Sequence, residues 1–244
     1  MSAEANHAAQ LEMPVIGQLL KRPLKAGKLL VFVYDPDSQW PMLLLNMVAE
    51  LVLKGTDVLY IITSRTVQDV RDDFLKRGLN TDQYEIEERL ILSDAFTLKT
   101  GRPSPEKYSL PSLNVADLSI LSNKALDQWS AGSVRAFENV SEIAEASEDR
   151  SFLKFYRTWV SRLVTNGRIV IDGFVRGVHS EALYNSVTSF ADGVFELKTE
   201  EIDGKLESVM RARSFRGGPI DTSKHVVRID DNLVATLEAV AGRG

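Results

Sequence analysis

The sequence predicts an α/β protein with a doubly wound, mostly parallel sheet flanked by helices, completed by C-terminal antiparallel strands. Two observations support this prediction. Short apolar runs alternate with stretches of helical spacing through most of the chain, which is the order typical of parallel sheets with crossover helices. Two pairs of β-type segments then follow at 193–212 and 225–237, and Asp203-Gly204 in the first pair is a hairpin turn signal.

The first apolar run, residues 29–34, is expected to be a central strand of the sheet. It is continuous rather than alternating, as in strands that are covered on both faces. Turn residues follow at 35–38, and Pro41 suits the first turn of a helix, where its missing N–H costs nothing. Apolar residues then recur at helical spacing until Gly55, a residue typical of a helix C-terminus.

The later elements continue this alternation. Residues 97–114, with one glycine and three prolines, are predicted to be an irregular insertion. The aromatic residues of 151–165 lie at helical spacing and are expected in the core. Further strands are predicted at 58–62, 90–92, 133–140 and 168–172, and further helices at 11–20, 67–77, 117–129, 151–165 and 182–190.

Composition limits the classes of function. The 244 residues are 44% hydrophobic and carry a net charge of −5, so no global charge favours nucleic acid or anionic membranes. The absence of cysteine excludes disulfides and thiolate chemistry, and three scattered histidines make a histidine-rich metal site improbable. No apolar run approaches the roughly 18 to 20 residues that span a bilayer. We expect a cytoplasmic protein with a flexible tail at 1–10 and a single domain at 11–244.

The strand, turn and helix at residues 28–54 have the layout of a phosphate-binding loop without its chemistry. Such a loop needs glycines whose N–H groups surround the anion, a lysine for the phosphates and a hydroxyl for magnesium. Here two acidic residues would repel phosphate, and a tryptophan and a proline stand at the lysine and hydroxyl positions. The degenerate positions are Asp35, Asp37, Ser38, Gln39, Trp40 and Pro41. We interpret the turn as structural; the alternative is a remodelled nucleotide pocket in which Trp40 stacks on a base.

Several segments in order make residues 12–237 resemble the RecA-like ATPases of the KaiC and archaeal RadA-paralogue group. The stretch 161–167 and the C-terminal strand pairs also resemble the archaellum accessory ATPase. The resemblance implies a RecA-like sheet and a phosphate loop at residues 34–41. The segments that carry the resemblance to the main group are 55–63, 88–95, 190–197 and 211–222.

The resemblance also locates the family's other functional residues. The catalytic glutamate falls on Ser64 or Arg65, and neither side chain can act as a general base for water. The acid linked to magnesium falls on Glu138 or the following Asn139, so Glu138 is the retained acid. The arginine that reaches a neighbouring subunit's γ-phosphate falls on Arg216, while its companion lysine falls on Ser214.

The resulting hypothesis is a pseudo-ATPase, a non-catalytic regulatory or scaffolding subunit. We expect no ATP or magnesium cofactor, no bound metal, and a partner that is either a second copy or a paralogous KaiC/RadA-like ATPase. The alternatives are a nucleic-acid-binding accessory in recombination or repair, an archaellum-associated regulator, and a nucleotide-binding protein with a remodelled pocket. Nucleic acid is less favoured because acidic residues at 196–203 adjoin the basic residues at 211–228. Arg176 and His179 follow the strand at 168–172, at the edge where doubly wound folds bind ligands, although a connecting loop is the simpler interpretation.

Overall fold

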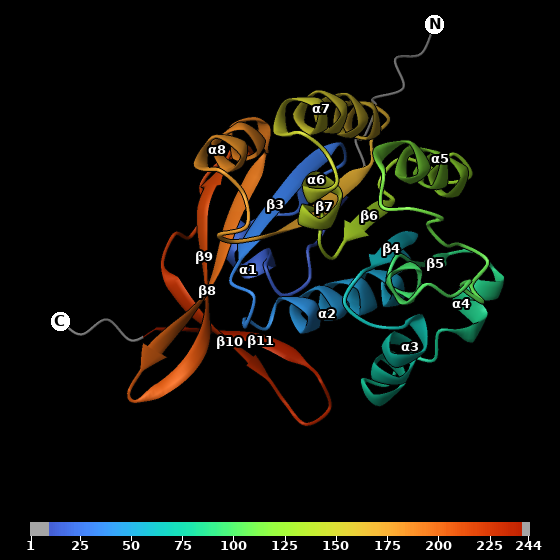
Figure 1. Ribbon diagram of the computed structural model, residues 1–244. Coiled ribbons are helices and arrows are strands. Elements are labelled where there is room, and N and C mark those ends of the chain that lie inside the picture. The colour runs from blue at the N-terminus through green and yellow to red at the C-terminus, as the bar shows by residue number, and fades with distance from the viewer. Residues whose placement is uncertain (1–9, 241–244) are drawn as a thin grey trace, which may run out of the picture.

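The computed structural model describes residues 10–240, which build one nine-stranded sheet covered by helices on both faces (Figure 1). The strand order is β11-β10-β9-β8-β3-β7-β6-β4-β5. The six strands β8, β3, β7, β6, β4 and β5 run parallel, and β9, β10 and β11 continue the sheet in antiparallel fashion. This confirms the predicted mostly parallel sheet with its C-terminal antiparallel extension.

The strands of this sheet have the following bounds: β3 Lys28–Tyr34, β4 Val58–Ile62, β5 Leu90–Asp94, β6 Val134–Phe137, β7 Ile169–Val175, β8 Gly193–Ile202, β9 Lys205–Phe215, β10 Lys224–Ile229 and β11 Ala235–Ala239. The helices are α1 Gly17–Leu20, α2 Trp40–Leu53, α3 Val67–Lys76, α4 Asp82–Ile86, α5 Val115–Leu126, α6 Ser141–Glu145, α7 Asp149–Thr165 and α8 Glu181–Phe190.

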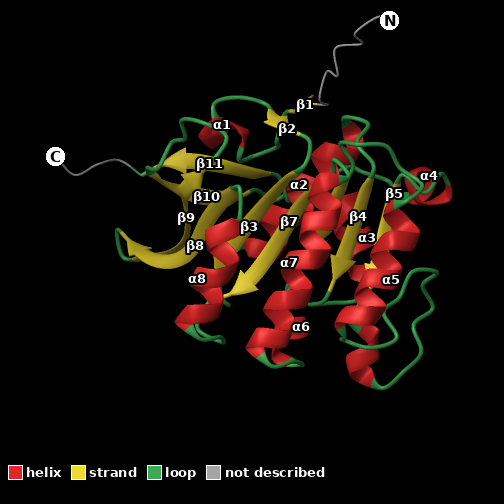
Figure 2. Cartoon of the chain, turned by 90° about the horizontal axis from the view of Figure 1, so that it is seen from above, coloured by secondary structure: helices red, strands yellow, loops and turns green. Residues whose placement is uncertain are grey.

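The central strand β3 shows why its sequence is apolar at every position. Leu30, Phe32 and Tyr34 pack into a core shared with α1, α2 and α3. The alternate residues of the same strand pack into a second core, shared with α5, α6, α7 and α8. Successive side chains of a strand point to opposite faces, so a strand buried on both faces needs a continuous apolar run. Figure 2 shows the helices on the two sides of the sheet.

The second core encloses a buried ion pair between neighbouring strands. Arg135 of β6 lies with its Nη1 2.6 Å from Oδ1 of Asp172 on β7, and neither side chain is exposed. Tyr156 of α7 donates a hydrogen bond of 2.6 Å from its hydroxyl to Asp172 Oδ2. The Arg135 guanidinium lies 4.2 Å from the ring centre of Trp159. The predicted core position of the α7 aromatic residues is therefore confirmed, since three of the four are buried and Phe155 packs against the cluster.

Some expectations differ from the structure. Only Gly17–Leu20 of the predicted helix 11–20 is helical: Leu11 belongs to β1 (Gln10–Leu11), which pairs with β2 (Leu24–Lys25), and residues 14–16 form a turn. The predicted strand 133–140 ends at Phe137, since Glu138 turns into contacts with β4 and α6 begins soon after. Two helices of five residues, α4 and α6, were not predicted, being too short for periodicity to show.

The insertion at residues 97–114 is irregular, as predicted. It contains one 3₁₀ turn, η1 Thr97–Thr100, and a single bridge between Asp94 and Ser109. Of the predicted flexible tail at 1–10, residues 1–9 lie outside the described residues. Between residues 10 and 240, no helix combines the length and apolar character needed to cross a membrane.

Candidate functional site

The turn between β3 and α2 lies at the carboxyl edge of the parallel strands, and its backbone is held by its neighbours. Ser38 donates its N–H to the Asp35 carbonyl at 3.0 Å, and Gln39 donates its N–H to Ser208 Oγ on β9 at 2.8 Å. Pro36 and Pro41 have no N–H to offer. A phosphate cradle needs several free N–H groups that converge on one point. Residues 36, 38, 39 and 41 of the turn therefore offer no free N–H group to such a cradle.

The two aspartates of this turn bind protein groups instead. Asp35 accepts hydrogen bonds from Arg176 Nε at 2.8 Å and from the Thr199 N–H at 3.0 Å. Asp37 accepts one from the Thr199 hydroxyl at 2.8 Å. The carboxylates thus connect the turn to β7 and β8, and they put negative charge where a nucleotide would carry its phosphates.

Trp40 occupies the position of the phosphate-loop lysine, and its side chain is fully buried. Its Nε1 donates a hydrogen bond of 2.7 Å to the carbonyl of Glu138, at the end of β6. The indole centroid lies 4.6 Å from that of Phe32 and 5.5 Å from that of Tyr34. The indole is thus packed in the core, an arrangement that favours the structural interpretation of the turn over the one in which Trp40 stacks on a base.

Gly173 on β7 makes room for this indole. A Cβ at residue 173 would lie 2.5 Å from Trp40 Nε1 and 2.3 Å from the Glu138 carbonyl oxygen. No side chain fits there without movement of the indole or the backbone. A glycine inside an apolar strand signals such a close approach, so this contact had a signal in the sequence.

Glu138, the retained acid, is also used by the protein. Its Oε2 accepts hydrogen bonds of 2.8 Å from the N–H groups of both Thr63 and Ser64, which follow β4. Its Oε1 lies 3.3 Å from the Tyr60 hydroxyl, and burial together with the charge of Glu138 raises the pKa of Tyr60 well above its ordinary value. The carboxylate fixes the end of β4 to the end of β6. Within residues 10–240, no group of three or more Asp, Glu, His or Cys side chains could hold a metal ion.

The insertion contributes a lysine that the sequence analysis did not single out. Lys99 Nζ lies 2.6 Å from the carbonyl oxygen of Thr63 and 2.6 Å from Glu142 Oε2. Burial raises the pKa of Glu142, and the hydrogen bond and charge of Lys99 oppose that rise. The 97–100 turn therefore lies against the ends of β4 and β6, on the same edge as Glu138.

The two positions aligned with the catalytic glutamate hold no general base. Ser64 is exposed, and the guanidinium of Arg65 forms an ion pair with Asp73 of α3. Arg65 places a positive charge near the end of β4 and offers no acceptor to a water molecule.

The loop after β7 is held by hydrogen bonds to the 35–39 turn and to α8. Arg176 binds the turn through Asp35, and its N–H donates to the Tyr34 carbonyl at 2.7 Å. The Tyr184 hydroxyl accepts the N–H groups of Val178 and His179 at 3.2 and 3.3 Å. The ion pair of Arg176 and the backbone hydrogen bond of His179 thus hold this loop in place, which agrees with a connecting loop.

Arg216 is exposed just after β9, away from the other predicted positions. Phe215 pairs with Gly193 at the start of β8, and Gly193 pairs with Leu30 near the start of β3. Arg216 therefore lies at the amino edge of the parallel strands, whereas the 35–39 turn lies at the carboxyl edge. Its guanidinium donates to the carbonyl of Ser189 at the end of α8. Ser214 pairs with Val194 in the sheet.

Most of the C-terminal cations are neutralised by acids on nearby strands of the sheet. Arg213 lies 3.4 Å from Glu196, and Lys224 lies 2.6 Å from Glu200. Arg228 contacts carboxylates on both β9 and β11. Such pairing weakens any phosphate-tracking surface on these strands.

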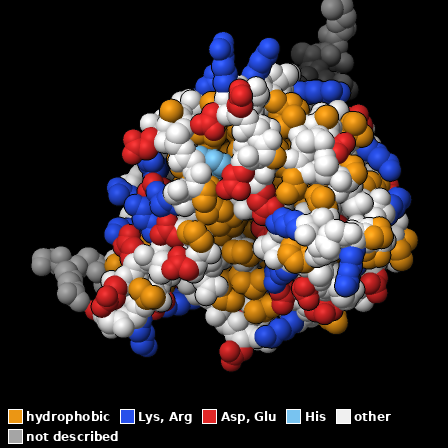
Figure 3. Space-filling model, viewed as in Figure 1, with side chains coloured by type: hydrophobic (Ala, Val, Ile, Leu, Met, Phe, Trp, Pro, Cys, Tyr) orange, Lys and Arg blue, Asp and Glu red, His pale blue; other side chains and the backbone are white. Residues whose placement is uncertain are grey.

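The surface of the carboxyl edge agrees with these contacts. Figure 3 shows hydrophobic side chains gathered around the start of α2 and the β10–β11 hairpin, with acidic side chains above them. A polyphosphate site instead needs donors and cations.

Comparisons with known proteins identify the family. The family described as ATPase: KaiC matches residues 43–240, a stretch that starts after the 35–39 turn and Trp40. Among solved structures, the KaiC-like protein PH0186 from the hyperthermophilic archaeon Pyrococcus horikoshii OT3 is similar over 96% of this chain and 99% of its own, with a TM-score of 0.73 and 14% identity. In all, 664 chains of solved structures match, so the fold alone selects no function. No curated protein matches the chain. Because the family match spans well over half of the sequence and agrees with the RecA-like sheet, the chain belongs to the KaiC family of ATPases.

Proposed function

We propose that this chain is a non-catalytic member of the KaiC family that serves as a regulatory or scaffolding subunit, by self-assembly or by pairing with an active ATPase of the same family. The observation that carries the proposal is Trp40. Its buried indole stands where phosphoryl transfer needs a lysine, and it is fixed to the Glu138 carbonyl. Phosphoryl transfer depends on cations that neutralise the developing phosphate charge, and a buried indole supplies none.

Three further features support the same proposal. The turn N–H groups of Ser38 and Gln39 are already bonded, and Asp35 adds negative charge beside them. The Glu138 carboxylate accepts two backbone N–H groups, so few of its lone pairs remain for a hydrated magnesium ion. Ser64 or Arg65 stands where the family has its base, and neither side chain can accept a proton from water at that place.

The proposal is tested by titrating the purified protein with a fluorescent ATP analogue, with and without magnesium. We expect no saturable binding up to millimolar nucleotide and no hydrolysis, while a catalytically active KaiC-family protein serves as the positive control. Micromolar binding would show that the edge around Trp40 accepts nucleotide, and the proposal would fall.

Arg216 gives the regulatory role a specific form. An arginine that reaches a partner's γ-phosphate needs no phosphate loop in its own chain, and such a residue is worth roughly 10³-fold or more in rate. Its exposure permits contact with a second subunit. If this chain stimulates an active partner, Arg216→Ala should abolish the stimulation, while Arg211→Ala on the same strand pair should leave it intact. Stimulation that survives Arg216→Ala would exclude this form of the role.

A further inference from the structure

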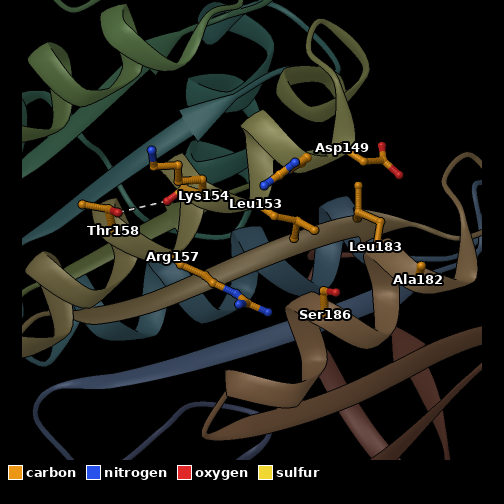
Figure 4. A pocket seen from close by; sticks show the side chains of 9 residues that line it. Asp149, Leu153, Lys154, Arg157, Thr158, Ala182, Leu183 and Ser186 are labelled. Carbon is orange, nitrogen blue, oxygen red and sulfur yellow. Dashed lines mark hydrogen bonds between the residues drawn. The ribbon is translucent and has the colours of Figure 1, made fainter.

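A groove lies between α7 and α8, on the face opposite α2 and α3, and none of the proposed ATPase positions contributes to it. Its volume is about 700 Å³. The floor is apolar and consists of Leu153, Ala182 and Leu183 (Figure 4). The Ser180 hydroxyl donates to Asp149 at 2.9 Å, which ties the start of α8 to the start of α7 and fixes this end of the groove.

Three cations border this apolar floor: Arg150, Lys154 and Arg157 of α7. Their spacing of four and three residues places them on one side of the helix. All three are exposed, and none forms an ion pair with any residue from 10 to 240. Arg157 instead lies 5.4 Å from the ring centre of Phe190. We call this surface the basic groove. A strip of unpaired cations beside an apolar floor suits a helical surface with exposed leucine or isoleucine and carboxylates.

The same chain carries a surface of that kind on α3 and α4. Leu75 and Ile86 are 62% and 75% exposed. Asp72 on α3 and Glu87, directly after α4, each accept a hydrogen bond from a glutamine four residues earlier, and neither has a cation partner among the described residues. Residues 67–87 contain six acidic and three basic side chains. We call the surface formed by Asp72, Leu75, Ile86 and Glu87 the acidic edge.

The two helices of the acidic edge are held together. Arg71 of α3 binds Glu85 of α4 with an Nη2–Oε2 distance of 2.8 Å, and it also binds Glu106 at 2.6 Å. An edge fixed in this way loses little conformational entropy when it docks.

From this complementarity we infer that the acidic edge of one copy docks into the basic groove of a second copy. The two surfaces lie on opposite sides of the molecule, since α3 packs into the first core and α7 and α8 into the second (Figure 1). The contact is therefore head-to-tail: the copy that contributes its edge keeps a free groove, and the copy that contributes its groove keeps a free edge. Such a contact grows into a ring if the rotation closes and into a filament if it does not. This inference rests on the proposed scaffolding function and assigns to it two contact surfaces, the basic groove and the acidic edge.

Charge reversal tests the contact by sedimentation velocity over a concentration series at low salt. The groove variant carries Arg150→Glu and Lys154→Glu, and the edge variant carries Asp72→Lys and Glu87→Lys. Each variant alone should associate at least about tenfold more weakly than the original chain, because every contact then opposes like charges. An equimolar mixture of the two should restore association, since the altered groove of one variant then meets the altered edge of the other, and the unaltered groove and edge also meet across the two variants.

A matched control reverses two exposed cations elsewhere, Arg102→Glu and Lys205→Glu, and should associate like the original chain. Circular dichroism confirms that each variant is folded. Association that survives both reversals, or a mixture that fails to restore it, overturns the contact, and so does an original chain that remains monomeric. The nucleotide titration on the same samples judges the scaffolding proposal separately. A monomer that ignores ATP leaves a non-catalytic subunit for a different partner, whereas ATP binding refutes the proposed function whatever the association shows.

Discussion

Replacing Trp40 by alanine should destabilise the protein strongly and should not create a nucleotide site. The indole is fully buried, so its loss removes a large apolar contact and leaves a cavity, a change that typically costs about 3–5 kcal/mol. The Glu138 carbonyl also loses its donor, which adds about 1–3 kcal/mol if no other donor replaces it. Because the two costs are not additive in general, we expect a total near 4 kcal/mol or more.

Urea unfolding followed by circular dichroism measures this loss as a shift of the transition midpoint at constant slope. Trp40→Phe keeps a six-membered ring but removes the pyrrole part of the indole with its N–H, so its loss should be smaller than that of Trp40→Ala, about 1–3 kcal/mol. Trp129→Ala is a matched control, because that indole also donates to a backbone carbonyl, at 2.9 Å from Glu88 O, but is only half-buried. Its loss should be clearly smaller. A Trp40→Ala variant within about 1 kcal/mol of the original chain would refute the packing argument, and one that binds ATP tightly would refute the functional argument.

Three further changes probe the same region and the buried ion pair. Asp172→Asn leaves the Arg135 charge buried without its partner and should cost about 3–5 kcal/mol in urea unfolding, whereas Asp172→Asn combined with Arg135→Met should recover part of that loss. Gly173→Ala should cost more than about 2 kcal/mol by the same assay, because its Cβ meets the Trp40 indole, and the smaller Trp40→Phe ring should reduce that cost. Burial lowers the pKa of His179 below 6.5, so the unfolded chain binds more protons than the folded chain near that pH. The His179 contribution to stability should therefore fall as the pH drops from 7 through 6.5, and His179→Gln should flatten this slope in thermal unfolding measured across the pH range.

The strands that the sequence predicted well are those whose burial is complete. The residues of β3 read as a continuous apolar run because alternate side chains enter different cores. The outer parts of β8 and β9 extend well beyond the predicted 193–197 and 206–212, to Ile202 and from Lys205 to Phe215. Residues 198–201 of β8 are polar and pair only with β9, so no hydrophobic pattern marks this outer part of the hairpin.

From the sequence, the candidate site could be predicted only through the residue types that it lacks. The lack of a lysine at Trp40 could be read directly from the sequence. The replacements that hold the edge together depend on tertiary contacts: Lys99 reaches Thr63 from 36 residues away, and Gln39 bonds Ser208 from 169 residues away. No local sequence pattern predicts a contact between residues so far apart in the chain. Gly173 had such a signal, since an isolated glycine in an apolar strand indicates that another group comes close, but the predicted strand ended at residue 172 and so left this glycine out.

The tie between Trp40 and the ends of β6 and β4 affects how this protein should behave in a living cell. A domain whose loops are ordered by a bound nucleotide gains stability with nucleotide concentration, by roughly 2.7 kcal/mol when the ligand is at a hundred times its Kd. Here an indole and a carboxylate of the chain itself hold that edge. If the proposed function holds, the abundance of this protein should stay constant when starvation depletes ATP, and its conformation should not change with hydrolysis. An assembly that contains this protein would then have one subunit whose conformation stays constant while its ATP-hydrolysing partners change theirs.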